Sequence, residues 1–243
     1  MPTFVELWVY LSAKPLFGLT ATLVMYGLAQ AFYVRMQQAP WANPVLWTVV
    51  VLAAGLLATG VSYPSYFAGA QFIHFLLGPA VVALAWPLWT RRAELAKRWG
   101  ALLLAALAGG IASSVSAVVL GWAADLPREV ILSLAPKSVT APVAMGIAER
   151  IGGIPALAAV FAVVTGIAGA LAGKYLFDAL RIPTNRGGWS ARGFALGTAS
   201  HGIGAARAMQ VNDDAGAYAG LALGLQVLLA SLLMPLAFRL MGF

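Results

Sequence analysis

The residues best suited to chemistry in this chain lie in a short segment between two prolines, PKSVTAP at positions 136 to 142. Long apolar stretches flank the segment, which carries the side chains of Lys137, Ser138 and Thr140. An unpaired lysine near the middle of a bilayer costs about 2.5 to 3.5 kcal/mol. A proline such as Pro142 favours the first turn of a helix, where free backbone N–H groups attract anions. We therefore expect these residues to bind a small anion; the alternative is that Lys137 extends to the interface from a surface loop.

A second polar segment, GFALGTASHGIGAARAMQ at positions 193 to 210, is rich in glycine and too polar to face lipid. In a helical register, Ser200, Gly204 and Arg207 share one face. The planar guanidinium of Arg207 suits two carboxylate oxygens, and His201 could donate a hydrogen bond or carry a proton. The candidate binding residues of this segment are Ser200, His201, Gly202, Gly204 and Arg207.

The same polar residues have an ordinary structural interpretation. Arg207 could pair with Asp213 or Asp214 in the loop that follows, and His201 could be a packed, hydrogen-bonded side chain. Broken or polar backbone at membrane depth is tolerated only where protein or water surrounds it. We therefore expect both polar segments to line a cavity, with substrate binding by Arg207 and the ion pair both left open.

The composition indicates which elements must position these residues. Hydrophobic residues make up 61% of the 243 and charged residues only 9%, whereas soluble domains carry about 25% charged residues. We predict an all-α polytopic membrane protein, a single domain over residues 1–243, with re-entrant or broken half-helices between full spans. About six full transmembrane helices are expected, at residues 16–33, 44–60, 63–89, 101–122, 155–180 and 217–238.

Two short apolar pieces, residues 128–135 and 142–150, flank the PKSVTAP segment. Eight helical residues cover about 12 Å, less than half of a hydrocarbon core of about 30 Å. Basic clusters at residues 90–99 and 181–192 indicate two cytoplasmic loops. Both pieces must then enter and leave on the same side, so we predict a re-entrant pair of half-helices whose tip is PKSVTAP.

Several classes of function are disfavoured. The chain has no cysteine and only two histidines, which argues against disulfides and a metal site. We find no enzyme motif and expect no catalytic residues and no cofactor. The net charge of +7 fits basic cytoplasmic loops better than nucleic-acid binding. PAVVALA at 79–85 parallels PVAMGIA at 142–148, and paired proline-started segments are typical of inverted repeats in transporters.

Three long motifs carry a resemblance to a known family: PKSVTAPVAMGIAERIGGIPALAAVF, ALGTASHGIGAARA and FLLGPAVVALAWPLW. From about residue 20 to its end, the chain resembles the LrgB/CidB family of bacterial inner-membrane proteins. The family's motif residues are present here as Lys137, Ser138, Thr140, Pro142, Ser200, His201, Gly202 and Arg207.

The resemblance implies two different functions. Bacterial members are described as holin-like or antiholin-like modulators of murein hydrolase activity and lysis, usually with a small LrgA/CidA-type partner. A plant plastidial relative transports glycolate and glycerate, and some bacterial systems are linked to pyruvate uptake. We favour a transporter of small monocarboxylates, because a lysis pore has no need of cationic half-helix tips. We also expect a multi-pass location in the bacterial inner membrane and a homo-oligomer.

Overall fold

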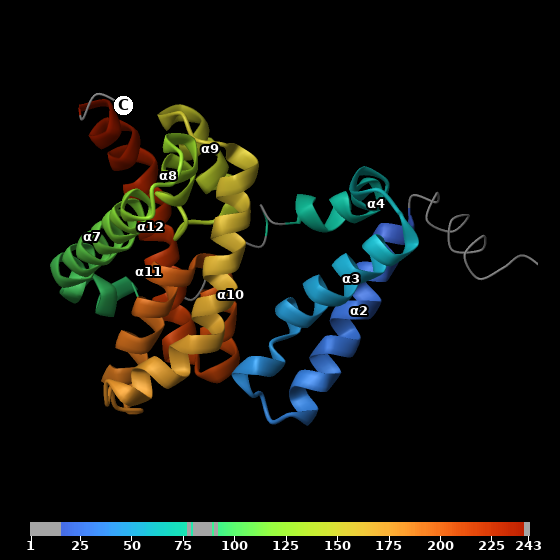
Figure 1. The fold of residues 1–243 in the computed structure, drawn as a ribbon. Coiled ribbons are helices and arrows are strands. Elements are labelled where there is room, and N and C mark those ends of the chain that lie inside the picture. The colour runs from blue at the N-terminus through green and yellow to red at the C-terminus, as the bar shows by residue number, and fades with distance from the viewer. Residues whose placement is uncertain (1–15, 77–78, 80–88, 90–91, 241–243) are drawn as a thin grey trace, which may run out of the picture. The chain divides into compact units, whose positions relative to one another are not determined.

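The computed structural model describes residues 16–76, 79, 89 and 92–240, and the helices of this part of the chain are shown in Figure 1. The described residues are helical, without a β-strand. The chain divides into two compact units, residues 1–83 and 84–243. The all-α prediction is therefore confirmed for the described residues.

The first unit contains the helices α2 (Leu16–Arg35), α3 (Pro44–Thr59) and α4 (Tyr63–Phe75), with a short 3-10 turn at Pro40–Ala42. Asn43 begins α3, because its side chain accepts hydrogen bonds from the backbone N–H groups of Val45 and Leu46. The hydroxyls of Thr22 and Tyr66 lie 2.6 Å apart and join α2 to α4.

The second unit carries both polar segments. Its helices are α7 (Arg92–Ala123), α8 (Arg128–Leu134), α9 (Ala141–Ile151), α10 (Pro155–Ala179), α11 (Arg186–Val211) and α12 (Asp213–Leu240). One hydrophobic core joins α8 and α9 to α10 and α12, and a second joins α7 to α11 and α12. Large apolar side chains such as Leu104, Leu120 and Leu232 are about 70% exposed, as expected of helices that face lipid.

Four helices of the described chain are long and apolar enough to cross a membrane: Leu16–Arg35, Ala96–Ala123, Pro155–Ala179 and Asp213–Leu240. They correspond to four of the predicted spans. The predicted span at 44–60 is the shorter α3, of 16 residues. Of the predicted span at 63–89, the first part forms α4 and most of the rest lies outside the described residues, as does the first copy of the repeat, at 79–85, apart from Pro79.

The described parts of the two basic segments are largely helical, with a loop only at residues 181–185. Helix α7 already begins at Arg92, because Ala, Glu, Leu, Lys and Arg all favour helix and no breaker precedes Gly100. Arg192 lies within α11, is 7% exposed, and pairs with Asp178 at 2.8 Å while donating to the carbonyl of Ile182. Arg192 therefore fixes the α10–α11 connection in place.

Candidate functional site

The predicted re-entrant segment folds as two short helices joined by a turn at residues 135–140. Helix α8 runs back along the end of α7: a side chain at Gly121 would lie 3.2 Å from Ile131, and Ser114 donates to the carbonyl of Ala135. The segment then closes on itself, since the backbone N–H of Ile154 donates to Ser133 Oγ at 2.7 Å. The two short arms are confirmed, and the return to the same side of the membrane stays a prediction.

The turn places its lysine against two serine hydroxyls. Lys137 Nζ donates to Ser113 Oγ at 2.8 Å and to Ser138 Oγ at 3.4 Å, and the two serine oxygens lie 2.6 Å apart. Lys137 is partly buried and Ser138 is buried. Both recorded partners of Lys137 are neutral, so neither balances its charge.

The contact with Ser113 fixes how deep the turn lies along α7. Ser113 stands ten residues before Ala123, the last residue of α7, and is therefore about 15 Å from that end. A hydrocarbon core is about 30 Å thick, so this distance is half of the core. If α7 crosses the membrane, the turn lies near the midplane.

The second arm of the hairpin is α9, and its N-terminus adjoins the turn. Thr140 stands at the N-cap position of α9 and Pro142 lies in its first turn, as the sequence predicts. The hydroxyl of Thr140 makes no capping hydrogen bond. The free N–H groups of this helix end therefore add to the positive potential around Lys137.

The second polar segment forms α11, which is broken in its middle. Ser200 and His201 leave the helical conformation. His201 has a φ of 41°, a backbone conformation that residues other than glycine rarely adopt. His201 Nε2 lies 2.8 Å from the carbonyl oxygen of Ala162 on α10. This contact agrees with the packed, hydrogen-bonded histidine that was one of the two interpretations.

A glycine on α10 allows the break to lie close to that helix. A side chain at Gly169 would lie 2.8 Å from Ser200 Cβ and would collide with the Ser200 hydroxyl. Gly169 stands 14 residues after Pro155, the first residue of a 25-residue helix, so the contact falls near the middle of α10. The break of α11 thus lies beside the middle of a helix long enough to span the membrane.

The hairpin turn and the break of α11 approach the same face of α7. A side chain at Gly109 would lie 2.8 Å from Thr198 Cγ2, just before the break. Ser113, which contacts the hairpin turn, lies four residues further along α7. Residues four apart in a helix share a face and are about 6 Å apart along the axis. The two polar segments are therefore neighbours, one helical turn apart.

Two hydroxyls next to this junction are buried and lack a hydrogen bond. Thr198 is 6% and Ser200 1% exposed, and neither hydroxyl has a hydrogen-bond partner among the described residues. A buried, unsatisfied hydroxyl costs about 1 to 3 kcal/mol. Such groups in a native fold call for an explanation, and a bound water or ligand would supply one.

The break corrects one prediction from the sequence. Ser200, Gly204 and Arg207 do not share one continuous helical face, because the non-helical dihedrals at Ser200 and His201 rotate the chain before Gly204. Gly202 begins the second half of α11, in which Gly204 and Arg207 are buried. The recorded contacts of Lys137 go to Ser113 and Ser138, and its predicted convergence with Arg207 on one ligand stays a prediction.

One of the two predicted alternative partners of Arg207, Asp214, also lies near another cation. Asp214 lies 3.9 Å from Arg186 Nε at the start of α11. Asn212 caps α12 by accepting hydrogen bonds from the backbone of Asp214 and Ala215. Asp213 and Asp214 lie in the first turn of α12, where acidic residues are favourable, and the pairing of either with Arg207 stays a prediction.

Sequence reasoning missed two residues of this junction, Ser113 and Thr198. Ser113 belongs to SSVS, a serine-rich run in an otherwise apolar span, and that run was the available signal. Thr198 lies within the glycine-rich segment, where its neighbours Ser200 and His201 drew attention. In the part of the chain that the structure describes, no three His, Asp or Glu side chains gather as metal ligands would.

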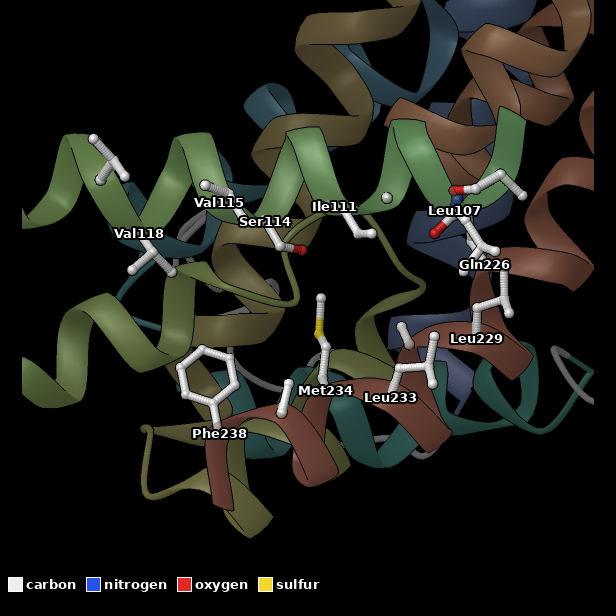
Figure 2. Close-up of a pocket in the computed structure, with 15 residues that line it drawn as sticks. Leu107, Ile111, Ser114, Val115, Val118, Gln226, Leu229, Leu233, Met234 and Phe238 are labelled. Atoms are coloured by element: carbon white, nitrogen blue, oxygen red, sulfur yellow. Dashed lines mark hydrogen bonds between the residues drawn. The ribbon is translucent and has the colours of Figure 1, made fainter. Parts of the chain in front are cut away.

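A separate cavity of about 510 Å³ lies between α7 and α12 (Figure 2). Met234 of α12 points toward α7, and Ile111 lies on the facing side of the cavity. Its polar lining groups already have partners, since Ser114 donates to Ala135 and Gln226 to the carbonyl of Ala106. No cationic side chain lines this cavity, so it does not suit a carboxylate.

Comparison with known proteins identifies the family to which the chain is related. A family model described as the LrgB-like family matches residues 22–240, which extends over both units. YxaC, an uncharacterized protein of Bacillus subtilis, is 35% identical over 81% of this chain and 84% of its own length. An uncharacterized protein of Haemophilus influenzae is 33% identical over 83% of this chain and 85% of its own length.

A further relative has a functional name. The holin-like protein CidB of Staphylococcus aureus is 29% identical over 88% of this chain and 91% of its own length. No solved structure matches the chain. The long apolar helices and these relatives indicate a multi-pass membrane protein. The resemblance carried by the three sequence motifs is thus confirmed, and the chain belongs to the LrgB-like family.

Proposed function

We propose that this chain carries small monocarboxylates, of the glycolate, glycerate, pyruvate or lactate type, across the membrane. The observation that carries the proposal is the position of Lys137, whose amine contacts only neutral hydroxyls among the described residues, about 15 Å from the C-terminal end of α7. The open helix end at Thr140 lies in the same turn. A carboxylate would balance the lysine, accept from the free N–H groups, and offset the desolvation of both.

The break of α11 would supply the rest of the site. Thr198 and Ser200 have buried hydroxyls without partners, and glycolate, glycerate and lactate carry a hydroxyl that could pair with one of them. Arg207, buried in the second half of α11, is proposed as the second cation. Gly202 leaves room for the ligand, because a side chain there would meet no atom within 4 Å, whereas Gly204 packs against Leu196 and Ser200. We assign His201 a positioning role, because its ring holds the break against Ala162.

The broken helices support transport on general grounds. Carriers commonly bind substrates near the midplane at half-helix ends, with the irregular backbone facing a cavity. We accordingly propose about six spans, the re-entrant hairpin at 128–150, and an inverted repeat related through the proline-started segments. We further propose a bacterial inner-membrane location, a homo-oligomer and an LrgA/CidA-type partner, with transport and no catalysis.

A second candidate function rests on the relatives. The name of CidB, holin-like protein, favours a role in membrane permeability and the control of murein hydrolases and lysis. A holin-like assembly requires helices that associate, and the small residues of α10, such as Gly166, Gly169 and Gly173, would allow close approach in other arrangements. In this structure α11 side chains already fill the space beside those three glycines. The glycines are therefore used within the chain rather than for association, which favours the carrier.

Uptake into proteoliposomes that contain only this protein tests the proposal. Radiolabelled glycolate, pyruvate and lactate are offered separately, and empty liposomes report passive entry. We expect protein-dependent uptake of at least one acid and its loss in Lys137→Ala. Lys174→Ala is the matched control, because Lys174 is exposed and pairs with Asp178 outside the site. Uptake of no acid above the level of empty liposomes would contradict the proposal.

A further inference from the structure

A second cavity, of about 530 Å³, lies between α7 and the first half of α11. Arg98 lines it near the basic start of α7, and Thr198 lines it beside the break of α11. Small side chains line part of it, namely Ala101, Ala105 and Gly109 on α7 and Ala191, Ala195 and Ala199 on α11, and the larger Leu102, Phe194 and Tyr218 line the rest. We call this cavity the α7–α11 groove.

The groove is long enough to connect the end of α7 with the candidate site. Arg98 and Gly109 are eleven residues apart on α7, which corresponds to about 16 Å of helix. Gly109 lies one turn before Ser113, the residue that contacts Lys137 and Ser138. The inner end of the groove therefore adjoins the hairpin turn.

Small residues alone could equally pack against lipid or another helix. Thr198 distinguishes the α7–α11 groove, because its side chain is 6% exposed and its hydroxyl has no hydrogen-bond partner in the described chain. Hydrocarbon would leave this hydroxyl unsatisfied. The hydroxyl is covered by protein in this conformation, and rotation about χ1 to another staggered rotamer would let water or a carboxylate in the groove pair with it.

We propose that the α7–α11 groove is the aqueous path by which a small carboxylate reaches the candidate site from the Arg98 side. This inference rests on the proposed function and adds the route and the direction of access. Arg98 raises the local concentration of anions at the outer end. The volume of about 530 Å³ leaves room for a hydrated acid of two or three carbons between the small side chains and Leu102, Phe194 and Tyr218, and Thr198 provides a hydrogen bond at the inner end.

Cysteine accessibility tests the path without interference, since the chain has no native cysteine. Ala105→Cys lies in the groove, and Leu104→Cys is its matched control, 68% exposed on α7 but absent from the groove lining. Vesicles with the Arg98 side outward receive a membrane-impermeant, sulfonate-bearing thiol reagent. Because a thiol reacts as thiolate, which needs water, we expect Ala105→Cys to react at least about tenfold faster than Leu104→Cys.

The charge of the thiol reagent gives a second test of the path. The anionic reagent should react with Ala105→Cys faster than a cationic reagent of similar size, and Arg98→Gln should reduce that preference. Added salt should do the same, because it screens the field of an exposed arginine. Thr198→Cys should also react, and glycolate should slow its reaction.

The labelling readout is separate from transport. Equal rates for Ala105→Cys and Leu104→Cys would overturn the path, because lipid or a partner helix would then fill the groove. If those vesicles still take up acid saturably, the proposed transport function is supported and only the proposed route is wrong. If Ala105→Cys is labelled but the vesicles take up no acid, the proposed transport function is overturned, and this inference with it.

Discussion

Lys137 contacts two neutral hydroxyls, Ser113 Oγ and Ser138 Oγ, at a point about 15 Å from the C-terminal end of α7. The lysine itself can be predicted from the sequence, because a single charge between two prolines in an apolar setting is costly unless it has a function. Ser113 cannot be predicted in the same way. Its contact with a turn 24 residues later depends on how α8 folds back along α7.

Removal of either proposed cation should strongly weaken transport. The loss of one partner from a buried, charge-assisted pair typically costs about 2 to 5 kcal/mol. At about 1.4 kcal/mol per tenfold, Lys137→Ala and Arg207→Ala should each weaken apparent affinity about thirtyfold or more. Arg207→Lys should rescue poorly, because a lysine lacks the bidentate fork. The measurement is the concentration dependence of acid uptake into proteoliposomes.

The neighbouring hydroxyls provide graded controls for this series. Ser138→Ala and Ser113→Ala each remove an acceptor of Lys137 Nζ and the contact between the two serines but keep the lysine charge, so each should weaken affinity less than Lys137→Ala does. All variants should insert in the membrane and purify in amounts similar to the parent. Parental transport by both Lys137→Ala and Arg207→Ala would show that the two cations are structural.

The hairpin is the element that sequence analysis described best. Its arms are too short to span, and the structure gives α8 seven and α9 eleven residues. The start of α9 at Thr140 and Pro142 also follows from the sequence, because the proline has no N–H to lose there. The way α8 packs along α7 depends on side-chain contacts such as Gly121 with Ile131, which a local pattern does not contain.

The two ends of the hairpin should be accessible from the same side of the membrane. Leu126 and Ile154 flank it and are 37% and 40% exposed, so each can carry a cysteine. We expect an impermeant thiol reagent to label Leu126→Cys and Ile154→Cys from the same face of oriented vesicles. Labelling from opposite faces would mean that residues 128–150 cross the membrane.

The sequence predicts broken helices among the polar segments, but the position of the break in α11 could not be predicted, because a helical register fits Ser200 to Arg207. The glycines at 202 and 204 indicated a flexible segment, but the positive φ falls on His201, which carries a ring. Such a conformation persists when its surroundings hold it. Here the hydrogen bond to Ala162 and the close approach at Gly169 do so, and both belong to a distant helix.

Gly169→Ala should therefore destabilise the second unit. The added methyl collides with Ser200, and overpacking of this kind typically costs about 1 to 3 kcal/mol. Gly224→Ala is the matched control in α12, where an added methyl meets no atom within 4 Å. We expect a lower midpoint of thermal unfolding in detergent for Gly169→Ala only. Identical midpoints for the two variants would contradict the close packing of the break against α10.

At the scale of the whole molecule, composition predicts an all-helical membrane protein. The helix ends are less predictable: α7 begins at Arg92 because charged residues extend a helix beyond the apolar core. The site lies wholly within residues 84–243, the second unit, and is built from α7, α9, α10 and α11. Long-range contacts between these helices, such as Gly109 with Thr198, decide which polar residues become neighbours.

The central claim is that the chain carries acids through a defined anion site, and one comparison tests it directly. Proteoliposomes loaded with a neutral fluorescent dye are offered radiolabelled acid over a range of concentrations, with and without unlabelled short acids. The account predicts uptake that saturates, is competed by similar monocarboxylates, and proceeds while the dye is retained. Dye release together with non-saturating, unselective acid entry would contradict it and favour a holin-like pore.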